Sequence, residues 1–142
     1  MPRSGIGPAV TSPADSAKRP RILVVEDEDD VRRLLVLGLD AVGDVTAAAD
    51  GLEAYERIVA GFAPDVIVTE LMMPRMDGLT LLGRLKQEGL ARKVPVVILS
   101  AKTRALEVIE GINAGARHYV TKPFEMANLV QKVRSALERR AR

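Results

Sequence analysis

The chain has 142 residues, a length that fits one domain with its own hydrophobic core. Apolar residues make up 47% of it and charged residues 28%, as in soluble globular proteins, and no apolar run approaches the ~20 residues that span a bilayer. With a formal charge of +2, two tyrosines, two phenylalanines and no tryptophan, it lacks the basic and aromatic surface of single-stranded nucleic acid binders. We expect neither membrane insertion nor a nucleic-acid partner.

The chain contains no cysteine, which excludes disulfides, thiol nucleophiles and thiolate metal sites and is compatible with a reducing compartment. Residues 1–20 have several prolines, no hydrophobic periodicity and no apolar segment typical of a secretory signal. We therefore expect a flexible leader over residues 1–20, a folded domain over residues 21–140, and a cytoplasmic location.

The folded part begins with an apolar run, Arg21–Val25, that predicts a strand, and an acidic run follows it at residues 26–30. A helix follows to Gly43, and either Asp29 or Asp30 is placed to cap its first turn. The apolar residues that recur with helical spacing are Val31, Leu34, Leu35, Leu37 and Leu39.

A weaker strand, Asp44–Ala48, precedes Asp50, which we expect to be the N-cap of a second helix that Gly61 ends. The apolar side of this helix carries Leu52, Tyr55, Ile58 and Val59. The third strand, residues 66–69, stops at the carboxylate of Glu70. A turn at residues 74–78 then leads into a third helix, whose apolar residues are Leu79, Leu81, Leu82 and Leu85.

The same alternation continues to the end of the chain. A fourth strand is predicted at residues 95–100, followed by a helix from about Arg104 to Asn113, a fifth strand at residues 117–121 and a last helix from Glu125 to about Arg139. Strands that alternate with helices in this way predict an α/β, doubly wound, five-stranded parallel sheet flanked by five helices.

Polar side chains stand where the strands end, and the carboxyl ends of parallel strands meet at one edge of the sheet. They are Glu26 and Asp27, Glu70, Ser100 and Lys122. Taken singly, each has an ordinary structural explanation. The acids after the first strand could cap a helix, Ser100 could be a strand-end hydroxyl, and Lys122 could be a solvated charge. Together they form an oxygen-rich site suited to Mg²⁺ and to phosphate chemistry, with a lysine and a hydroxyl for phosphoryl oxygens.

Four fragments carry a family resemblance: Val24-Val25-Glu26-Asp27, the run from Met72 to Gly78, Ser100-Ala101, and Lys122-Pro123-Phe124. Their combination resembles the response regulator receiver domain over about residues 21–139. In that family an aspartate at the end of the third strand accepts a phosphoryl group from a sensor histidine kinase or a phosphotransfer protein. The resemblance implies a flavodoxin-like fold, a signalling role and Mg²⁺ as the cofactor.

The resemblance also implies the roles of individual residues. Glu26 and Asp27 would hold Mg²⁺, together with Glu70 and the backbone carbonyl of Met72. Ser100 would contact the phosphoryl group.

On the fifth strand, the resemblance implies that Lys122 pairs with the phosphoryl group and that its bond to Pro123 is cis. Ala101 would leave room for access to the site. Tyr119 resembles the aromatic switch that turns inward when Ser100 is drawn to the phosphate, whereas without the resemblance ordinary sheet packing would be the favoured interpretation.

Glu70 departs from the family pattern, because it stands where the family has its phosphoaccepting aspartate. Its extra methylene moves the carboxylate by roughly 1.5 Å, and a displacement of ~1 Å costs on the order of 100-fold in rate when catalysis depends on positioning. We expect phosphotransfer to be blocked, or the phosphorylated state to be partly mimicked. A natural receiver that lost phosphotransfer and an engineered aspartate-to-glutamate mimic both fit, and the retained acidic pair, Ser100 and Lys122 favour the second.

We interpret the chain as a protein-binding switch rather than a metabolic enzyme, with no output domain after the last helix. Its partner surface is expected around Arg104 to Arg139, which would also serve a homodimer. Two alternatives stay open: a pseudo-receiver scaffold that works without phosphorylation, and a Mg²⁺-dependent phosphatase or flavodoxin-like enzyme. The chain lacks a Ser/Thr/Gly-rich phosphate loop after the first strand, which argues against the enzymes.

Overall fold

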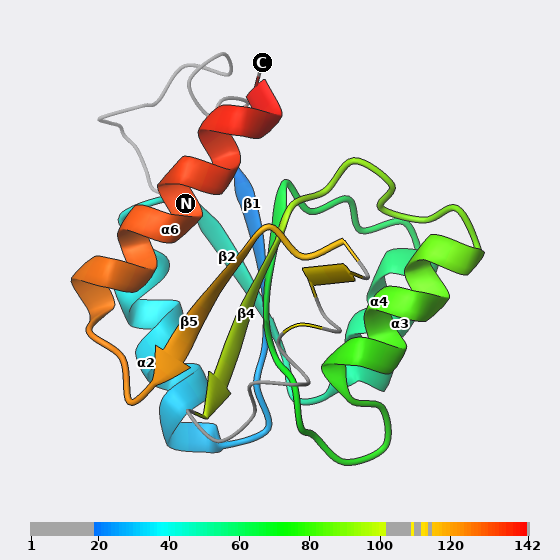
Figure 1. The fold of residues 1–142 in the computed structure, drawn as a ribbon, viewed down its shortest axis with the longest axis horizontal. Helices are drawn as coiled ribbons and strands as arrows, with labels where there is room; N and C mark the ends of the chain where they lie inside the picture. Colours follow the sequence, from blue (N-terminus) through cyan, green and yellow to red (C-terminus); the bar gives the residue numbers. More distant parts are fainter. Residues whose placement is uncertain (1–18, 102–108, 110–111, 114, 142) are drawn as a thin grey trace, which may run out of the picture.

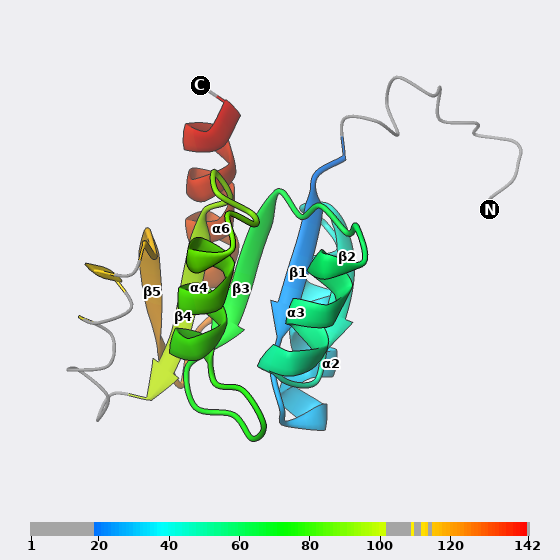
Figure 2. The same ribbon diagram turned by 90° about the vertical axis from the view of Figure 1, so that its right-hand side faces the viewer.

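The computed structural model describes residues 19–101, 109, 112–113 and 115–141. Five strands form one sheet in the order β2-β1-β3-β4-β5, and every neighbouring pair is parallel (Figure 2). The strands are β1 (Arg21–Val25), β2 (Asp44–Ala48), β3 (Val66–Glu70), β4 (Val96–Ala101) and β5 (His118–Lys122). The predicted doubly wound parallel sheet is confirmed.

Helices cover both faces of this sheet (Figure 1). On one face lie α2 (Asp29–Leu39) and α6 (Met126–Ala141), and on the other lie α3 (Gly51–Val59) and α4 (Gly78–Gln87). The described residues thus contain four of the five expected helices. The fifth falls on residues 104–113, most of which lie outside the described part, although Ile109, Ile112 and Asn113 are helical. No described helix is long and apolar enough to cross a membrane.

The expected leader also falls almost wholly outside the described residues. Only its last two positions are described, and both contact Asp44, the first residue of β2. Arg19 Nε donates to Asp44 at 2.8 Å, and the Pro20 carbonyl accepts the Asp44 N–H at 2.8 Å.

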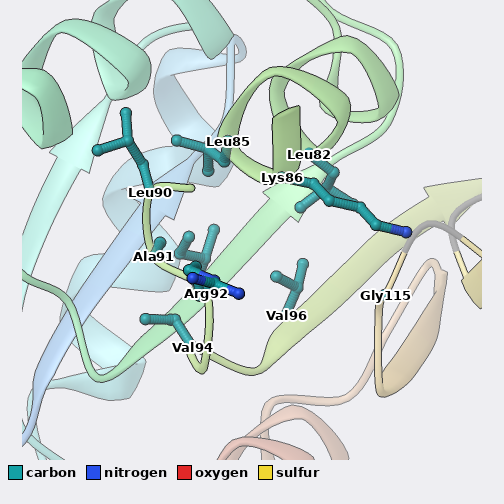
Figure 3. A pocket seen from close by; sticks show the side chains of 10 residues that line it. Leu82, Leu85, Lys86, Leu90, Ala91, Arg92, Val94, Val96 and Gly115 are labelled. Carbon is teal, nitrogen blue, oxygen red and sulfur yellow. The ribbon is translucent and has the colours of Figure 1, made fainter. Parts of the chain in front are cut away.

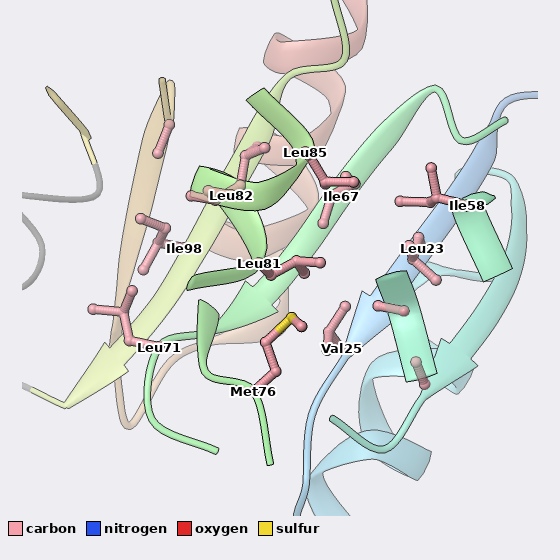
Figure 4. Packing of buried hydrophobic residues seen from close by; sticks show 14 residues of the cluster. Leu23, Val25, Ile58, Ile67, Leu71, Met76, Leu81, Leu82, Leu85 and Ile98 are labelled. Atoms are coloured by element: carbon pink, nitrogen blue, oxygen red, sulfur yellow. The ribbon is translucent and has the colours of Figure 1, made fainter. Parts of the chain in front are cut away.

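Strands β1, β3 and β4 contain continuous apolar runs because their side chains point alternately into two separate cores. One core, between the sheet and helices α3 and α4, contains Leu23, Ile67, Leu81 and Ile98 (Figure 4). The other, between the sheet and helices α2 and α6, contains Ile22, Leu35, Val68, Val97 and Leu129. Burial on both faces therefore accounts for the absence of polar alternation that the sequence displays.

Three apolar helix residues expected on the buried stripe are instead exposed. Leu34, Leu37 and Val59 are 53%, 69% and 55% exposed. Successive helix residues are rotated by about 100°, so Leu35 and Leu39 can face the sheet together while Leu37 points to the opposite side. The buried side of α2 is therefore narrower than its apolar sequence predicts.

The helix caps agree only in part with expectation. Asp50 is confirmed as the N-cap of α3, because its side chain accepts the Glu53 N–H at 2.9 Å. The prediction that Asp29 or Asp30 caps α2 is wrong: the N-cap position is Glu28, whose side chain makes no capping hydrogen bond. Both aspartates lie inside the first turn, where they stabilise α2 through their charge alone.

Candidate functional site

The polar residues expected at the strand ends lie at one edge of the sheet. Glu70 pairs in register with Leu99 of β4, and Ala101 of β4 pairs with Lys122 of β5. Glu26 follows directly after β1, and its backbone N–H donates to the Ala48 carbonyl at 3.1 Å. The parallel registers therefore bring side chains from β1, β3 and β5 within contact distance.

Lys122 is the centre of this edge. Its ammonium nitrogen lies 2.9 Å from Glu26 Oε1 and 2.9 Å from Glu70 Oε1, and 4.0 Å from a carboxylate oxygen of Glu28. The Glu26 side chain is completely buried, and those of Lys122 and Glu70 are only 18% and 14% exposed. We call the set Glu26, Lys122 and Glu70 the ion triad.

Burial shapes the proton affinities of the ion triad. Loss of solvent raises the pKa of the Glu26 carboxyl above its ordinary value, against the opposing effect of the Lys122 ammonium. Burial alone would lower the pKa of Lys122, but its hydrogen bonds to Glu26 and Glu70 outweigh that effect and raise the pKa. Lys122 therefore stays a cation held between two acids.

The other oxygen of each acid is bound by the backbone. Glu70 Oε2 accepts the N–H of Leu71 at 2.7 Å, and Glu26 Oε2 accepts the N–H of Glu28 at 3.1 Å. Gly78 lies against this turn, donating its N–H to the Leu71 carbonyl at 2.8 Å, and a Cβ at Gly78 would stand 2.5 Å from the Glu70 carbonyl oxygen. The glycine is needed here because the loop folds back onto the end of β3.

The remaining site residues surround the ion triad without joining it. Ser100 is buried, and its hydroxyl donates to the Ala101 carbonyl at 3.2 Å. Asp27 is exposed, and so is the side chain of Met72 in the loop after β3. Tyr119 is 49% exposed on β5, and the peptide bond between Lys122 and the next residue is cis.

The family is decided by comparison with known proteins. Residues 22–134 match the family model of the response regulator receiver domain. The chain belongs to the response regulator receiver family. Receivers of response regulators are signalling domains rather than metabolic enzymes.

Similar curated proteins are full transcriptional regulators. The receiver is 40% identical over 124 residues to the transcriptional regulatory protein CseB of Streptomyces avermitilis, covering 87% of this chain and 51% of that protein. It is 34% identical over 121 residues to the DNA-binding dual master transcriptional regulator RpaA of Synechocystis, covering 84% of this chain and 50% of RpaA. The chain spans about half the length of these relatives.

Solved structures agree on the fold. A putative response regulator from Chloroflexus aurantiacus superposes with a TM-score of 0.78 at 36% identity, covering 85% of this chain and 99% of that one. The Francisella response regulator 1452 receiver domain gives a TM-score of 0.75 at 35% identity, covering 84% and 98% of the two chains.

The receiver's acids do not form a ready cation site. Within the described part of the chain, no group of three or more acidic or histidine side chains is arranged to hold a metal ion. The reason is visible in the ion triad: both oxygens of Glu26 and both oxygens of Glu70 already accept hydrogen bonds. Carboxylate and carbonyl oxygens are still the donors that Mg²⁺ prefers, so the donor chemistry fits while Lys122 competes for it.

One contact of the receiver was missed at the level of sequence. Arg75, in the loop after β3, adopts a positive φ of 65° and its Nε lies 2.5 Å from the buried carboxylate of Asp50. The Gly51 N–H donates to the Met76 carbonyl at 2.9 Å beside it. These contacts attach the loop that carries Met72 to the start of α3. The sequence signals Asp50 as a helix cap, but nothing local signals its pairing with Arg75.

Proposed function

We propose that residues 21–140 form a cytoplasmic two-component receiver that acts as a protein-binding switch, with Glu70 at the phosphoacceptor position blocking phosphotransfer. The kinase or phosphotransfer protein that serves this family would be its input partner. One observation carries the proposal: the Glu70 carboxylate is held at both oxygens, 2.9 Å from Lys122 Nζ and 2.7 Å from the Leu71 N–H.

Two physical effects make Glu70 a poor phosphoacceptor. Its extra methylene displaces the nucleophilic oxygen by roughly 1.5 Å from where an aspartate would place it. In-line phosphoryl transfer depends on positioning, so such a displacement costs on the order of 100-fold or more. The hydrogen bonds to Lys122 and Leu71 further reduce the availability of both oxygens.

The contacts of Ser100 and Tyr119 favour a blocked receiver over a phosphorylation mimic. A mimic would draw the Ser100 hydroxyl to the Glu70 carboxylate and bring Tyr119 inward. Instead the Ser100 hydroxyl donates to the Ala101 carbonyl, and Tyr119 is 49% exposed. Glu70 thus engages Lys122 but not the hydroxyl that would signal activation.

Mg²⁺ would be held by Glu26, Asp27, Glu70 and the backbone carbonyl of Met72. When bound, the ion would offset the negative charge of phosphoryl oxygens. Asp27 is exposed and Glu26 lies at the end of β1, so the pair presents one accessible and one buried carboxylate. Because Lys122 already balances Glu26 and Glu70, we expect weak Mg²⁺ affinity that rises when Glu70 is shortened.

The partner surface proposed between Arg104 and Arg139 is partly described. A hollow of about 540 Å³ lies between β5 and the start of α6. Its lining combines apolar and charged residues, among them Tyr119, Phe124, Glu125 and Lys132. We propose that a downstream protein, or a second copy of this chain, docks there.

The deciding experiment compares the protein with Glu70→Asp after incubation with acetyl phosphate and Mg²⁺. Mass spectrometry should detect a phosphoryl group on the Asp variant and none on the parent. Glu56→Asp, which shortens an exposed acid on α3, is the matched control and should stay unmodified. Phosphorylation of the parent to a similar extent would show that Glu70 does not block transfer.

Partner binding then separates the mimic from the blocked switch. If the unmodified parent binds a partner with the same affinity as the phosphorylated Glu70→Asp variant, Glu70 is a mimic of the phosphorylated state. If Glu70→Asp is not phosphorylated, and neither Mg²⁺ nor beryllofluoride shifts the backbone amide signals in NMR spectra, the domain is a scaffold with a vestigial site. Flavin absorbance in the purified protein would instead favour the flavodoxin-like alternative.

A further inference from the structure

A second cavity lies at the opposite end of the sheet, where β3 and β4 begin (Figure 3). It has a volume of about 430 Å³ and lies between α4 and the segment that leads from α4 into β4. Four of the residues that line it belong to the core and are at most 5% exposed: Ile67, Leu82, Leu85 and Val96. We call it the amino-edge pocket. Its inner wall is therefore apolar.

Two cationic side chains also line this pocket. Lys86, on α4, and Arg92, in the following segment, both line the amino-edge pocket and are exposed to solvent (Figure 3). None of the described lining residues is acidic, and within the described part of the chain neither cation has a carboxylate partner. This contrasts with Arg32, Arg57 and Arg84, which pair with acids along α2, α3 and α4.

The segment that places Arg92 has a specific backbone conformation. Gly89 has a φ of 69°, and Ala91 has a φ of 50°, a left-handed conformation that costs a residue with a Cβ some strain. Backbone hydrogen bonds hold it: the Leu90 N–H donates to the Leu85 carbonyl at 2.8 Å, and the Val94 N–H donates to the Ala91 carbonyl at 3.1 Å. Backbone hydrogen bonds thus fix the conformation of the segment that forms this wall of the pocket.

We propose that the amino-edge pocket binds a medium-chain alkyl carboxylate, with its hydrocarbon chain over the half-buried Leu90, Ala91 and Val94 and its carboxylate at Lys86 or Arg92. The volume lies in the range of small-molecule sites, which combine an apolar lining with a few polar groups that orient the ligand. Charge-assisted hydrogen bonds from an ammonium and a guanidinium are suited to a carboxylate. The pocket lies at the opposite edge of the sheet from Glu70, so ligand binding there does not depend on whether Glu70 blocks phosphotransfer.

The first test titrates octanoate into the methyl-labelled protein and follows the leucine and valine methyl signals by NMR. Shifts should concentrate on Leu82, Leu85, Leu90, Val94 and Val96. Affinity should rise with each methylene added from hexanoate to octanoate, by at most about fourfold, the increment for a fully buried methylene. Octanol, which has no charge, should bind at least several-fold more weakly. Equal binding of octanol, or shifts spread over the surface, would overturn the proposal.

The second test reverses the two cations. In Lys86→Glu/Arg92→Glu the dissociation constant for octanoate should rise about tenfold or more, since two attractive charges become repulsive. Lys93→Glu changes an exposed lysine that does not line the pocket and should leave the constant within about twofold. The methyl spectrum of each variant reports directly whether the fold is intact. An unchanged dissociation constant in the folded double variant refutes the assignment of the carboxylate to these cations.

Discussion

The two edges of the sheet treat charge in opposite ways. At the carboxyl edge, the two acids of the ion triad share one ammonium at 2.9 Å each, and backbone N–H groups bind their remaining oxygens. At the amino edge, Lys86 and Arg92 stay in solvent above an apolar wall. Buried charges need an opposite charge and hydrogen bonds to replace their lost solvent, whereas exposed cations need no partner and remain available for a ligand. Replacing Lys122 tests this difference directly, and three further predictions test packing and pairing elsewhere in the fold.

The largest effect should come from removing the shared cation of the ion triad. Lys122→Met leaves Glu26 buried without its counter-charge, and breaking a buried ion pair in this way costs about 3–5 kcal/mol of unfolding free energy. Lys86→Met at the amino edge is the control and should change the unfolding free energy by less than about 0.5 kcal/mol. Urea denaturation measures both. Glu26→Gln added to Lys122→Met should recover part of the loss, and equal costs at the two edges would contradict the comparison.

Truncating a core leucine should cost less beside the amino-edge pocket than in the opposite core. Leu85→Ala widens a pocket that already opens to solvent, so we expect about 2 kcal/mol. Leu35→Ala, from a completely buried position between α2 and the sheet, leaves a sealed cavity and should cost about 4 kcal/mol. Urea midpoints compare the two variants. A larger loss at Leu85 would mean that the pocket is closed in solution.

Stability in acid should depend on Asp50. Burial of its carboxyl would raise its pKa, but the Arg75 guanidinium and the Glu53 N–H lower it below the ordinary value of 3.8. A lowered pKa stabilises the fold above the unfolded-state value and loses that effect as the pH falls through the folded-state value. Asp50→Asn keeps a capping oxygen but loses the charge. The difference in unfolding free energy between parent and variant should be constant above pH ~5 and shrink below pH ~4. A difference that stays constant down to pH ~2 would contradict the pairing with Arg75.

The smallest effect is expected on the outer side of α2. Leu37 is 69% exposed, so Leu37→Ser should change the unfolding free energy by less than about 0.5 kcal/mol. Leu39→Ser, at a completely buried position of the same helix, is the matched control and should be strongly destabilising. Similar losses in the two variants would indicate that α2 packs with a different rotation.

Strands β1, β3 and β4 were predictable from sequence because each buries both faces and so contains a run of three or four apolar residues. Asp50 was predictable as a cap because a capping hydrogen bond joins residues close in sequence. The exposure of Leu34 and Leu37 was not predictable, since helical periodicity does not determine which side of an apolar helix packs against the sheet. The Asp50–Arg75 contact was also missed, as it joins residues 25 positions apart.

By itself, the sequence determined the alternation of strands and helices and the positions of Glu26, Asp27, Glu70, Ser100 and Lys122 at strand ends. Those properties depend on local pattern and on the geometry of parallel sheets. Only the tertiary structure decided that Lys122 bridges Glu26, 96 positions away, and Glu70, while the Ser100 hydroxyl turns to a backbone carbonyl. Side-chain partners across strands depend on register, burial and rotamer together, and the packing of the whole sheet determines all three.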